Sequence, residues 1–397
     1  MKTISIVVKK LNILFLCLIL ITCFCLTGCQ DKYEIEQNAI ALALAFDLDK
    51  SGNYVMAVQI LTSSSSSSAQ SQSNTGTGTP SATTYMSTGK NIYDTVYQFS
   101  KILGKPIRFT DVKCIVIGSV LASKGIGPVI DFSLRFIELR PYTPILVTTD
   151  RIQDVLNIKS NDQPIFAFAV EELIKRQSRI GFTSISTNLD FANDFSGENP
   201  ITTCGYVTLD KRRTEENYPR IKLTGSAVFK KDKLIGYLNA LETRGLQWIK
   251  GTINLGSILI EGPDKRFINL GIKNGSSRMN SKKINGKMTI QCTVRVETTV
   301  RVMWSDIDPS KNVDIMYALS EKQNEAINNE INLAIDAAKN RLSADIFDFG
   351  ELIYRQHPKD WKEMKKNWET AFLSTPIDVK ISSMVVNTGT ISKSLIK

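Results

Sequence analysis

The sequence predicts an α+β fold of more than one domain, with mixed or antiparallel sheets and flanking helices. Three observations support this class. In the first half, apolar strand-like runs alternate with helical patterns. In the second half, a long alternating strand is followed by a long amphipathic helix. After a predicted leader, 369 residues remain, which is enough for two or three domains of ~100–200 residues each.

Residues 1–28 have the pattern of a lipoprotein signal peptide. Three lysines lie among the first ten residues, an apolar stretch covers 11–26, and Leu26-Thr-Gly-Cys29 forms a lipobox. The apolar stretch is shorter than the ~20 residues that a membrane-spanning helix needs. We therefore expect cleavage before Cys29 and acylation of that residue with chains such as palmitate. Lipid would then hold the mature chain on the extracytoplasmic face of a membrane.

Two strands are expected at the start of the mature chain, at 39–48 and 54–61. The turn between them, 47–52, is rich in aspartate and resembles a calcium-binding loop. Such a loop needs a bidentate glutamate where this chain has Val58. A β-hairpin turn is therefore the better interpretation.

Residues 62–84 form a low-complexity tract with six consecutive serines and no charged, aromatic or large aliphatic residue. Such a composition cannot bury enough surface to offset the entropy of ordering the chain. An extended pattern resumes at Thr84. We expect a disordered loop between two strands of one domain rather than a domain boundary.

The rest of the first region alternates helices and strands. Asn91 is a candidate N-cap for a helix that ends near Gly104. The elements expected next are an apolar strand at 112–120, a helix at 127–139, a strand at 144–148 and a helix at 152–156. The segment 188–199 reads as polar and irregular, and 210–220 reads as a charged link to a second region.

The second region opens with a hairpin of strands 223–229 and 234–238. A strand at 287–302 alternates strictly, with Ile290, Cys292, Val294 and Val296 on one face. An amphipathic helix at 316–346, a second helix at 358–372 and a strand at 378–386 follow. The second helix carries Trp361, Met364 and Trp368 on one face. That face could lie on a membrane, but burial in a core is the favoured interpretation.

Catalytic patterns are missing from the sequence. The single histidine, His357, precedes a proline at the start of a lysine-rich helix, where a surface or capping role is expected. The chain has no nucleophile elbow, phosphate-binding loop or HExxH motif, so we expect no enzyme activity, cofactor or metal. Paired carboxylates cannot be recognised from sequence, which leaves a lipid-anchored cell-wall hydrolase as an alternative.

The cysteine content and the net charge of the chain limit the kinds of protein that the sequence can encode. Cys114, Cys204 and Cys292 remain after the lipobox, an odd number without close pairs, so no disulfide framework is predicted. Cys114 and Cys292 lie in strand patterns and are expected to be buried. The net charge falls from +10 to +7 when the leader is removed. This excess suits either an anionic membrane surface or ordinary solvation, and no pattern favours nucleic acid.

Several blocks of sequence together carry a resemblance to a known family. The blocks are Thr88–Tyr93, Leu134–Arg140, Leu223–Asn239, Glu242–Gly245, Asp345–Gly350, Tyr354–Trp361 and Asn367–Trp368. With the lipobox, they closely resemble the Ger(x)C lipoproteins, the C subunits of spore germinant receptors. Two departures are the length of the serine tract and the segment Asp31-Lys-Tyr-Glu34, where the family commonly has a Trp-Asp-Arg-type sequence.

The resemblance implies three α+β domains, at 29–205, 206–275 and 276–397, with 220–397 as the family's C-terminal region. It also implies a non-enzymatic receptor subunit in the spore inner membrane, required for germination through receptor assembly or signalling. Its partners would be an A subunit and a transporter-like B subunit, and direct nutrient binding is not expected. A solute-binding lipoprotein of a transporter is the main alternative.

The residues of these blocks are expected to have structural roles. Gly225 and Gly236 would bracket the hairpin, and Gly350 would suit a helix C-terminus. Phe229, Tyr237 and Leu238 would pack in a core.

Overall fold

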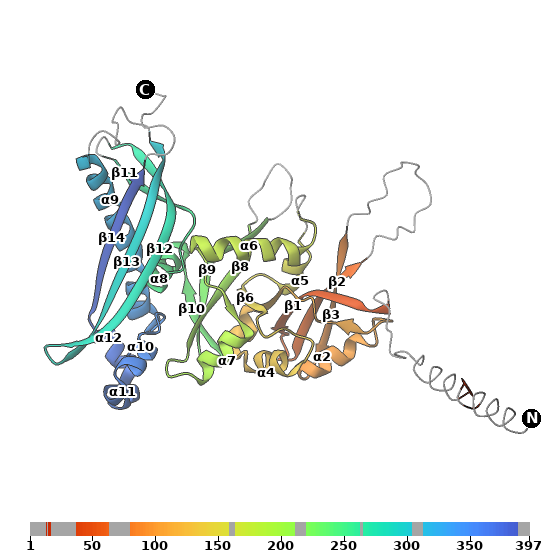
Figure 1. Ribbon diagram of the computed structural model, residues 1–397. Helices are drawn as coiled ribbons and strands as arrows, with labels where there is room; N and C mark the ends of the chain where they lie inside the picture. The colour runs from red at the N-terminus through yellow and green to blue at the C-terminus, as the bar shows by residue number, and fades with distance from the viewer. Residues whose placement is uncertain are drawn as a thin grey trace, which may run out of the picture.

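The computed structural model describes residues 13, 15, 16, 37–62, 80–158, 163–210, 220–262, 265–303 and 313–387. They form a mixed α+β fold with two sheets, which confirms the predicted class (Figure 1). Within these ranges no helix is both long and apolar enough to cross a bilayer. The rest of the predicted leader, Cys29 and positions 63–79 of the serine tract lie outside the described residues.

The first sheet has ten strands. Its main path runs β10-β9-β8-β6-β5-β1-β2-β3, with β4 paired to β1 and β7 paired to β6. Neighbours β1, β5, β6 and β8 are parallel, whereas the strands at both ends of the sheet pair antiparallel. In chain order the strands are β1 (Ala39–Leu48), β2 (Tyr54–Thr62), β3 (Ser81–Gly89), β4 (Ile107–Arg108), β5 (Cys114–Gly118), β6 (Pro144–Thr148), β7 (Ser186–Thr187), β8 (Ile201–Asp210), β9 (Arg220–Lys230) and β10 (Lys233–Leu238).

Helices cover both faces of this sheet (Figure 1). On one face lie α2 (Ile92–Phe99), α3 (Ser119–Lys124), α4 (Gly127–Arg135) and α7 (Asn188–Ser196). On the other lie α5 (Ile152–Leu156) and α6 (Phe166–Ile180). Strand β1 shows the consequence, because Leu44 and Phe46 pack toward the first group while Ala43 and Ala45 pack toward the second. A strand covered on both faces needs a continuous apolar run, as this segment has.

The second sheet has four strands in the order β11-β12-β13-β14. Its strands are β11 (Ser257–Glu261), β12 (Phe267–Ile284), β13 (Lys287–Met303) and β14 (Ile377–Asn387). The predicted alternation of β13 is confirmed, since Ile290, Cys292, Val294 and Val296 are all buried. The helices of this part are α8 (Ala240–Lys250), α9 (Val313–Asp336), the π-helix η3 (Ala337–Leu342), α10 (Phe349–Gln356), α11 (Pro358–Met364), the 3-10 turn η4 (Lys365–Asn367) and α12 (Trp368–Ser374).

The strand predicted at 112–120 ends earlier than expected. Strand β5 stops at Gly118, and α3 begins at the next residue. The carboxylate of Asp47 lies against Gly118 and accepts the backbone N–H of Leu121 at 3.1 Å. This acceptor satisfies a free donor at the start of α3, so the chain turns into a helix while its sequence remains apolar.

The segment 188–199, predicted as irregular, contains helix α7. Its N-cap is Thr187, whose side chain accepts from the N–H of Asp190, while the Asp190 carboxylate accepts from the N–H of Thr187. This reciprocal pair is a capping box. The spacing Thr-x-x-Asp was visible in the sequence, but the polar composition concealed the helix.

Several helices and one strand begin or end at other residues than the sequence predicts. The Asn91-capped helix ends at Phe99 and α4 ends at Arg135. The helix predicted at 316–346 is α-helical to Asp336 and then π-helical to Leu342. The helix predicted at 358–372 is three short elements, α11, η4 and α12. Residues 81–83, predicted as loop, belong to β3, which pairs with β2.

The two sheets divide the chain between β10 and β11. Asp210 and Arg220, predicted to flank a link between regions, are paired residues of β8 and β9 in one sheet. The expected boundaries at 205/206 and 275/276 fall inside β8 and β12. The hairpin of β9 and β10 therefore completes the first sheet, although it follows the charged segment.

Candidate functional site: the junction of the two sheets

The blocks near the C-terminus meet around Asp345, which is buried where the C-terminal helices contact the first part of the chain. Its Oδ1 accepts the N–H groups of Phe347 and Phe349, each at 3.2 Å. Its Oδ2 accepts the N–H of Gly350 at 2.7 Å and the indole N–H of Trp368 at 3.2 Å. Burial raises the pKa of Asp345 to about 6, although these donors favour the ionised form. This carboxylate therefore organises the turn that leads into α10.

Gly350 lies near the start of α10, so its predicted place at a helix C-terminus is wrong. A β carbon on Gly350 would lie 2.8 Å from Nε1 of Trp368 and 2.9 Å from Cη2 of Trp361. The glycine is needed because two indoles occupy the space of its side chain. The rings of Trp361 and Trp368 pack edge to face, with their centroids 5.3 Å apart. Both side chains are buried, which confirms that this face of the predicted helix packs in a core.

The same helices contact the segment between α7 and β8. The indole N–H of Trp361 donates to Glu198 at 2.8 Å, and Lys365 pairs with that carboxylate at 2.6 Å. The side-chain amide of Asn199 donates to the carbonyl of Asp345 at 2.8 Å. These contacts join the two sheets through residues more than a hundred positions apart.

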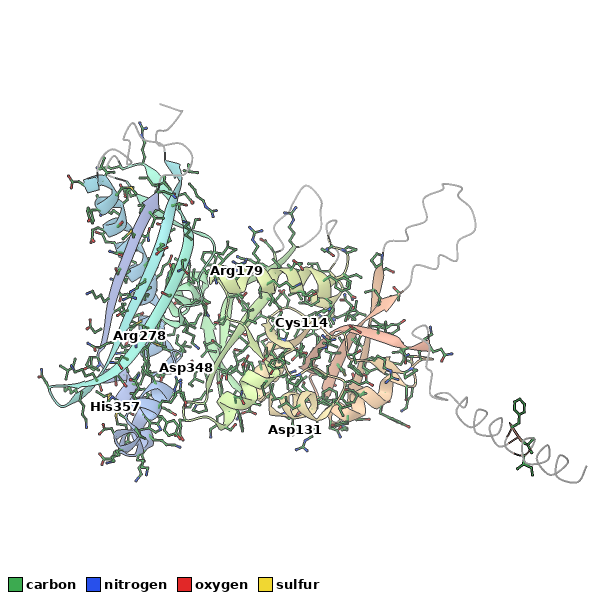
Figure 2. The ribbon with its side chains drawn as sticks, viewed as in Figure 1. Cys114, Asp131, Arg179, Arg278, Asp348 and His357 are labelled. Atoms are coloured by element: carbon green, nitrogen blue, oxygen red, sulfur yellow. The ribbon has the colours of Figure 1, made fainter. Side chains whose placement is uncertain are left out.

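Charged groups lie along this junction. Lys250 pairs with Asp348 at 2.8 Å, and Figure 2 shows Asp348 between the second sheet and the first part of the molecule. Asp194 of α7 lies nearby and accepts from the hydroxyl of Thr202 at 3.0 Å. Burial raises the pKa of Asp194 to about 6, and the charge of Asp348 adds to the shift. These groups bond to other protein groups and so contribute to the packing of the junction.

The residues of the block Glu242–Gly245 lie at the start of α8, and each makes a contact that holds this helix in place. Asn239 caps the helix and forms a capping box with Glu242. Glu242 also binds Arg341 of the π-helix at 2.6 Å, and the hydroxyl of Thr243 donates to Ser226 at 3.2 Å. In the sequence alone this block stands out only by its resemblance to the family. The spacing Asn-x-x-Glu was the signal that indicates a helix start.

Arg244 and Glu330 form a buried ion pair at 3.1 Å between α8 and α9. Glu330 also accepts the indole N–H of Trp248 at 2.6 Å, and Arg244 donates to the carbonyl of Ser257 at 2.8 Å. Burial raises the pKa of Glu330 and lowers that of Arg244, and the attraction between them opposes both shifts. The pair and its hydrogen bonds link α8 to α9 and to β11.

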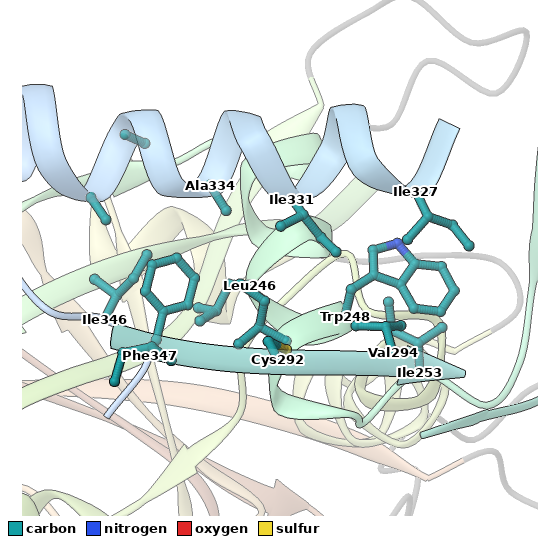
Figure 3. Packing of buried hydrophobic residues seen from close by; sticks show 14 of the residues in the cluster. Leu246, Trp248, Ile253, Cys292, Val294, Ile327, Ile331, Ala334, Ile346 and Phe347 are labelled. Carbon is teal, nitrogen blue, oxygen red and sulfur yellow. The ribbon is translucent and has the colours of Figure 1, made fainter. Parts of the chain in front are cut away.

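The apolar core continues this contact. Figure 3 shows Ile327, Ile331 and Ala334 of α9 facing Trp248 of α8 and the inner side of β13. Gly245 lies directly against the backbone of Glu330, so the two helix axes approach closely. Burial at these positions confirms the amphipathic character predicted for the helix at 316–346.

The other predicted site residues have structural surroundings. Gly225 has a φ of 82° and its missing β carbon leaves room for the carbonyl of Leu238, whereas Gly236 faces Leu342. Phe229 and Leu238 are buried. His357 occupies the N-cap position of α11, and its Nε2 lies 2.9 Å from the carbonyl of Ser281.

The three described cysteines are free and buried, as predicted for Cys114 and Cys292. Burial raises the pKa of the thiol in Cys114, Cys204 and Cys292. Among the described residues no group of three or more histidine, cysteine or acidic side chains is placed to hold a metal ion. The acylation of Cys29 remains a prediction, since that residue is outside the described part.

Two hollows lie on the first part of the molecule. One, of about 250 Å³, is lined by apolar side chains of α4 and α7 such as Leu134 and Phe195. The other, of about 430 Å³, contains Lys113, Glu171 and Lys175, and Glu171 pairs with both lysines. The charged groups of the larger hollow are thus bonded to one another.

Comparison with known proteins agrees with the resemblance seen in the sequence. Residues 31–208 match the model of the spore germination protein N-terminal domain, and residues 224–389 match the spore germination B3/GerAC-like C-terminal model. Spore germination protein B3 of Bacillus subtilis (strain 168) is 25% identical over 99% of this chain and 100% of its own length. Spore germination protein KC of the same organism is 26% identical over 94% of this chain and 95% of its own length.

A solved structure supports the same fold. The crystal structure of the GerBC protein superposes with a TM-score of 0.53, covering 87% of this chain and 97% of that chain at 19% identity. The two family models follow one another in this chain in the order N-terminal, then C-terminal, and together match most of it. The chain therefore belongs to the Ger(x)C family and has a role in spore germination.

Proposed function

We propose that this protein is a lipid-anchored, non-enzymatic subunit of a nutrient germinant receptor. It would act in the spore inner membrane, where it supports receptor assembly or signalling together with an A and a B subunit. The observation that carries the proposal is the match along the whole length of spore germination protein B3 and 95% of that of protein KC. No cofactor or nucleic acid enters the proposal.

The arrangement of the junction supports a role through protein contacts. Its carboxylates are bound by backbone N–H groups, indoles and lysines, as described for Asp345 and Glu198. A general acid or base has to reach a reacting group in an accessible site, and Asp345 is only 3% exposed. The contacts of Asp345 and Glu198 are therefore those of groups that hold the junction together.

The anchor at Cys29 is tested with a matched pair of variants. Cys29→Ala removes the acylated thiol, whereas Cys25→Ala changes a cysteine within the same leader. We expect Cys29→Ala to accumulate as an uncleaved or released chain and to impair nutrient germination, and Cys25→Ala to behave as the parent. A Cys29→Ala chain that stays membrane-bound at mature size without lipid would contradict the anchor.

The receptor role is tested in a strain that lacks the protein. We expect loss of the response to one class of nutrients, with normal germination by agents that bypass nutrient receptors. Purification of the tagged protein from spore membranes should recover A-type and B-type subunits. A strain that responds normally to every nutrient, alone or in combination, would contradict the proposal.

Calorimetry separates this role from solute capture. Purified residues 30–397 should show no micromolar dissociation constant for amino acids or sugars, which would correspond to about −8 kcal/mol. The same preparation should leave cell-wall fragments intact. Tight binding of one nutrient would favour the solute-binding alternative.

A further inference from the structure

Ile137 is 98% exposed, although the segment that carries it is firmly held. It lies between α4 and β6, in the block Leu134–Arg140. On one side of it, the ring of Phe136 packs edge to face against Phe109, with ring centroids 5.1 Å apart. On the other side, Leu139 is buried. Core packing therefore fixes the backbone on both sides of Ile137 while its side chain projects into solvent. Burial in this chain does not explain an isoleucine at that position.

Other exposed side chains of matching chemistry lie in the same segment and in the segment that follows α2. Tyr142 is 74% exposed, and Arg140 between it and Ile137 is also exposed. After α2, Ile102 is 54% exposed and is flanked by the exposed Lys101 and Lys105. Apolar side chains beside tyrosine and basic residues are typical of surfaces that rest in the interfacial layer of a membrane.

These side chains lie close to the point where the chain enters the fold. The N–H of Ala39, the first residue of β1, donates to the carbonyl of Pro106 at 2.9 Å. Arg108 donates to Asn38 at 3.2 Å and pairs with Glu138, the neighbour of Ile137, at 2.8 Å. A short series of contacts thus connects the start of β1 to both exposed isoleucine segments.

The distance to the proposed anchor is short. Nine residues lead from Cys29 to Asn38, and at ~3.3–3.6 Å per residue they reach about 30 Å at most. This linker carries Asp31, Glu34 and Glu36 against one lysine, so it has no basic attraction of its own for anionic lipid. Attraction to the membrane beyond the anchor would have to come from the folded surface.

We propose that this surface docks on an anionic lipid bilayer; we call it the membrane-facing rim, and it consists of Lys101, Ile102, Lys105, Ile137, Arg140 and Tyr142. The inference rests on the proposed function, because the anchor brings the rim to the membrane. Ile137 and Ile102 enter the acyl boundary, Tyr142 lies at the headgroups, and the basic side chains bind lipid phosphates.

The rim gives the molecule a defined orientation. In Figure 1 the first strand starts at one end of an elongated molecule and the second sheet forms the other end. A docked rim therefore directs the second sheet away from the bilayer. The anchor alone would leave this orientation free.

The test uses the full-length, lipidated chain with a fluorophore attached through Ile137→Cys. The native cysteines in the described part are buried and Cys29 would be acylated, so labelling is selective. The protein is bound to vesicles of phosphatidylcholine and phosphatidylglycerol with brominated acyl chains. Met384→Cys on β14, 61% exposed in the second sheet, is the matched control.

We expect the brominated lipid to quench the fluorophore at position 137 at least twofold and to leave the one at position 384 unchanged. Lys101→Glu combined with Arg140→Glu should abolish most of the quenching while the chain still sediments with vesicles. Tyr142→Cys gives a second labelled site and should behave like position 137.

The failures of the two proposals differ. If the chain sediments with vesicles but position 137 is not quenched, docking of the rim is wrong and the anchor stands. If the parent chain does not sediment, the anchor is wrong and the inference falls with it. If position 137 becomes protected only in membranes that contain the other receptor subunits, the rim binds a protein, which also overturns the lipid proposal.

Discussion

Replacing Gly245 by alanine should destabilise the contact between α8 and α9. The added β carbon would lie 2.6 Å from the carbonyl carbon of Glu330 and 2.9 Å from the β carbon of Ala334, and closer still to the Glu330 oxygen. The obstructing atoms belong mainly to the backbone of α9, so no side chain can rotate away. The helix itself has to move.

The cost follows from two opposing effects. Overpacking a tight core costs roughly 1–3 kcal/mol, and a backbone obstacle places Gly245→Ala at about 3 kcal/mol. Displacement of α9 also lengthens the hydrogen bond from Trp248 to Glu330. Alanine is better than glycine inside a helix by about 1 kcal/mol. The net loss is about 2 kcal/mol, or ~4–8 °C in Tm when the part that contains α8 and α9 unfolds as a unit of ~150–250 residues.

The assay compares urea and thermal unfolding of residues 30–397 in the parent and the variant. Gly104→Ala is the matched control, because no atom lies within 4 Å of its would-be β carbon and its φ is not left-handed. The control should change stability by less than ~0.5 kcal/mol. A Gly245→Ala protein as stable as the parent would show that α8 and α9 do not pack as described.

Three further predictions concern other parts of the chain. Asp194→Asn should stabilise the protein above pH 6 and have no effect below about pH 4. The pKa of Asp194 in the folded protein, about 6, exceeds its ordinary value of 3.8, so the parent loses stability as the pH rises from about 4 to 6. Urea midpoints of parent and variant, measured from pH 4 to 7, check the sign. Gly350→Ala should cost roughly 1–3 kcal/mol by pressing on Trp361 and Trp368, and a shift in tryptophan emission should accompany the lower urea midpoint. Replacing 63–79 by a short Gly/Ser turn should leave Tm nearly unchanged, since loop closure changes by only ~0.6 kcal/mol per doubling of length, and a loss of several degrees would show that the tract packs on the fold.

Elements with a strong period were predictable from the sequence. Strands β1 and β6 and helix α5 have the predicted bounds, and β13 shows the predicted alternation. In these segments the local pattern of apolar residues and the tertiary burial agree. The lipobox prediction depends on sequence alone and stays untested by the fold.

The failures lie where a distant residue decides the local structure. Asp47 ends β5 and starts α3 from more than 70 positions away, which no local pattern reveals. The sequence predicts Gly350 at a helix C-terminus. The glycine is needed instead because Trp361 and Trp368, from a later segment, leave no room for a side chain. The charged segment between Asp210 and Arg220 predicts a link to a second region. The two residues instead pair in neighbouring strands, so the hairpin that follows belongs to the first sheet.

The pairing of β8 with β9 has a consequence for cutting this chain in two. The N-terminal family match ends at residue 208 and the C-terminal match begins at 224, so a cut between them would leave paired strands on different polypeptides. The first fragment would expose the edge of β8, which invites aggregation, and the second would carry a hairpin without its sheet. A soluble first fragment therefore has to extend through Leu238, the end of β10. Two genes produced by fission at this point would encode halves that depend on each other to fold.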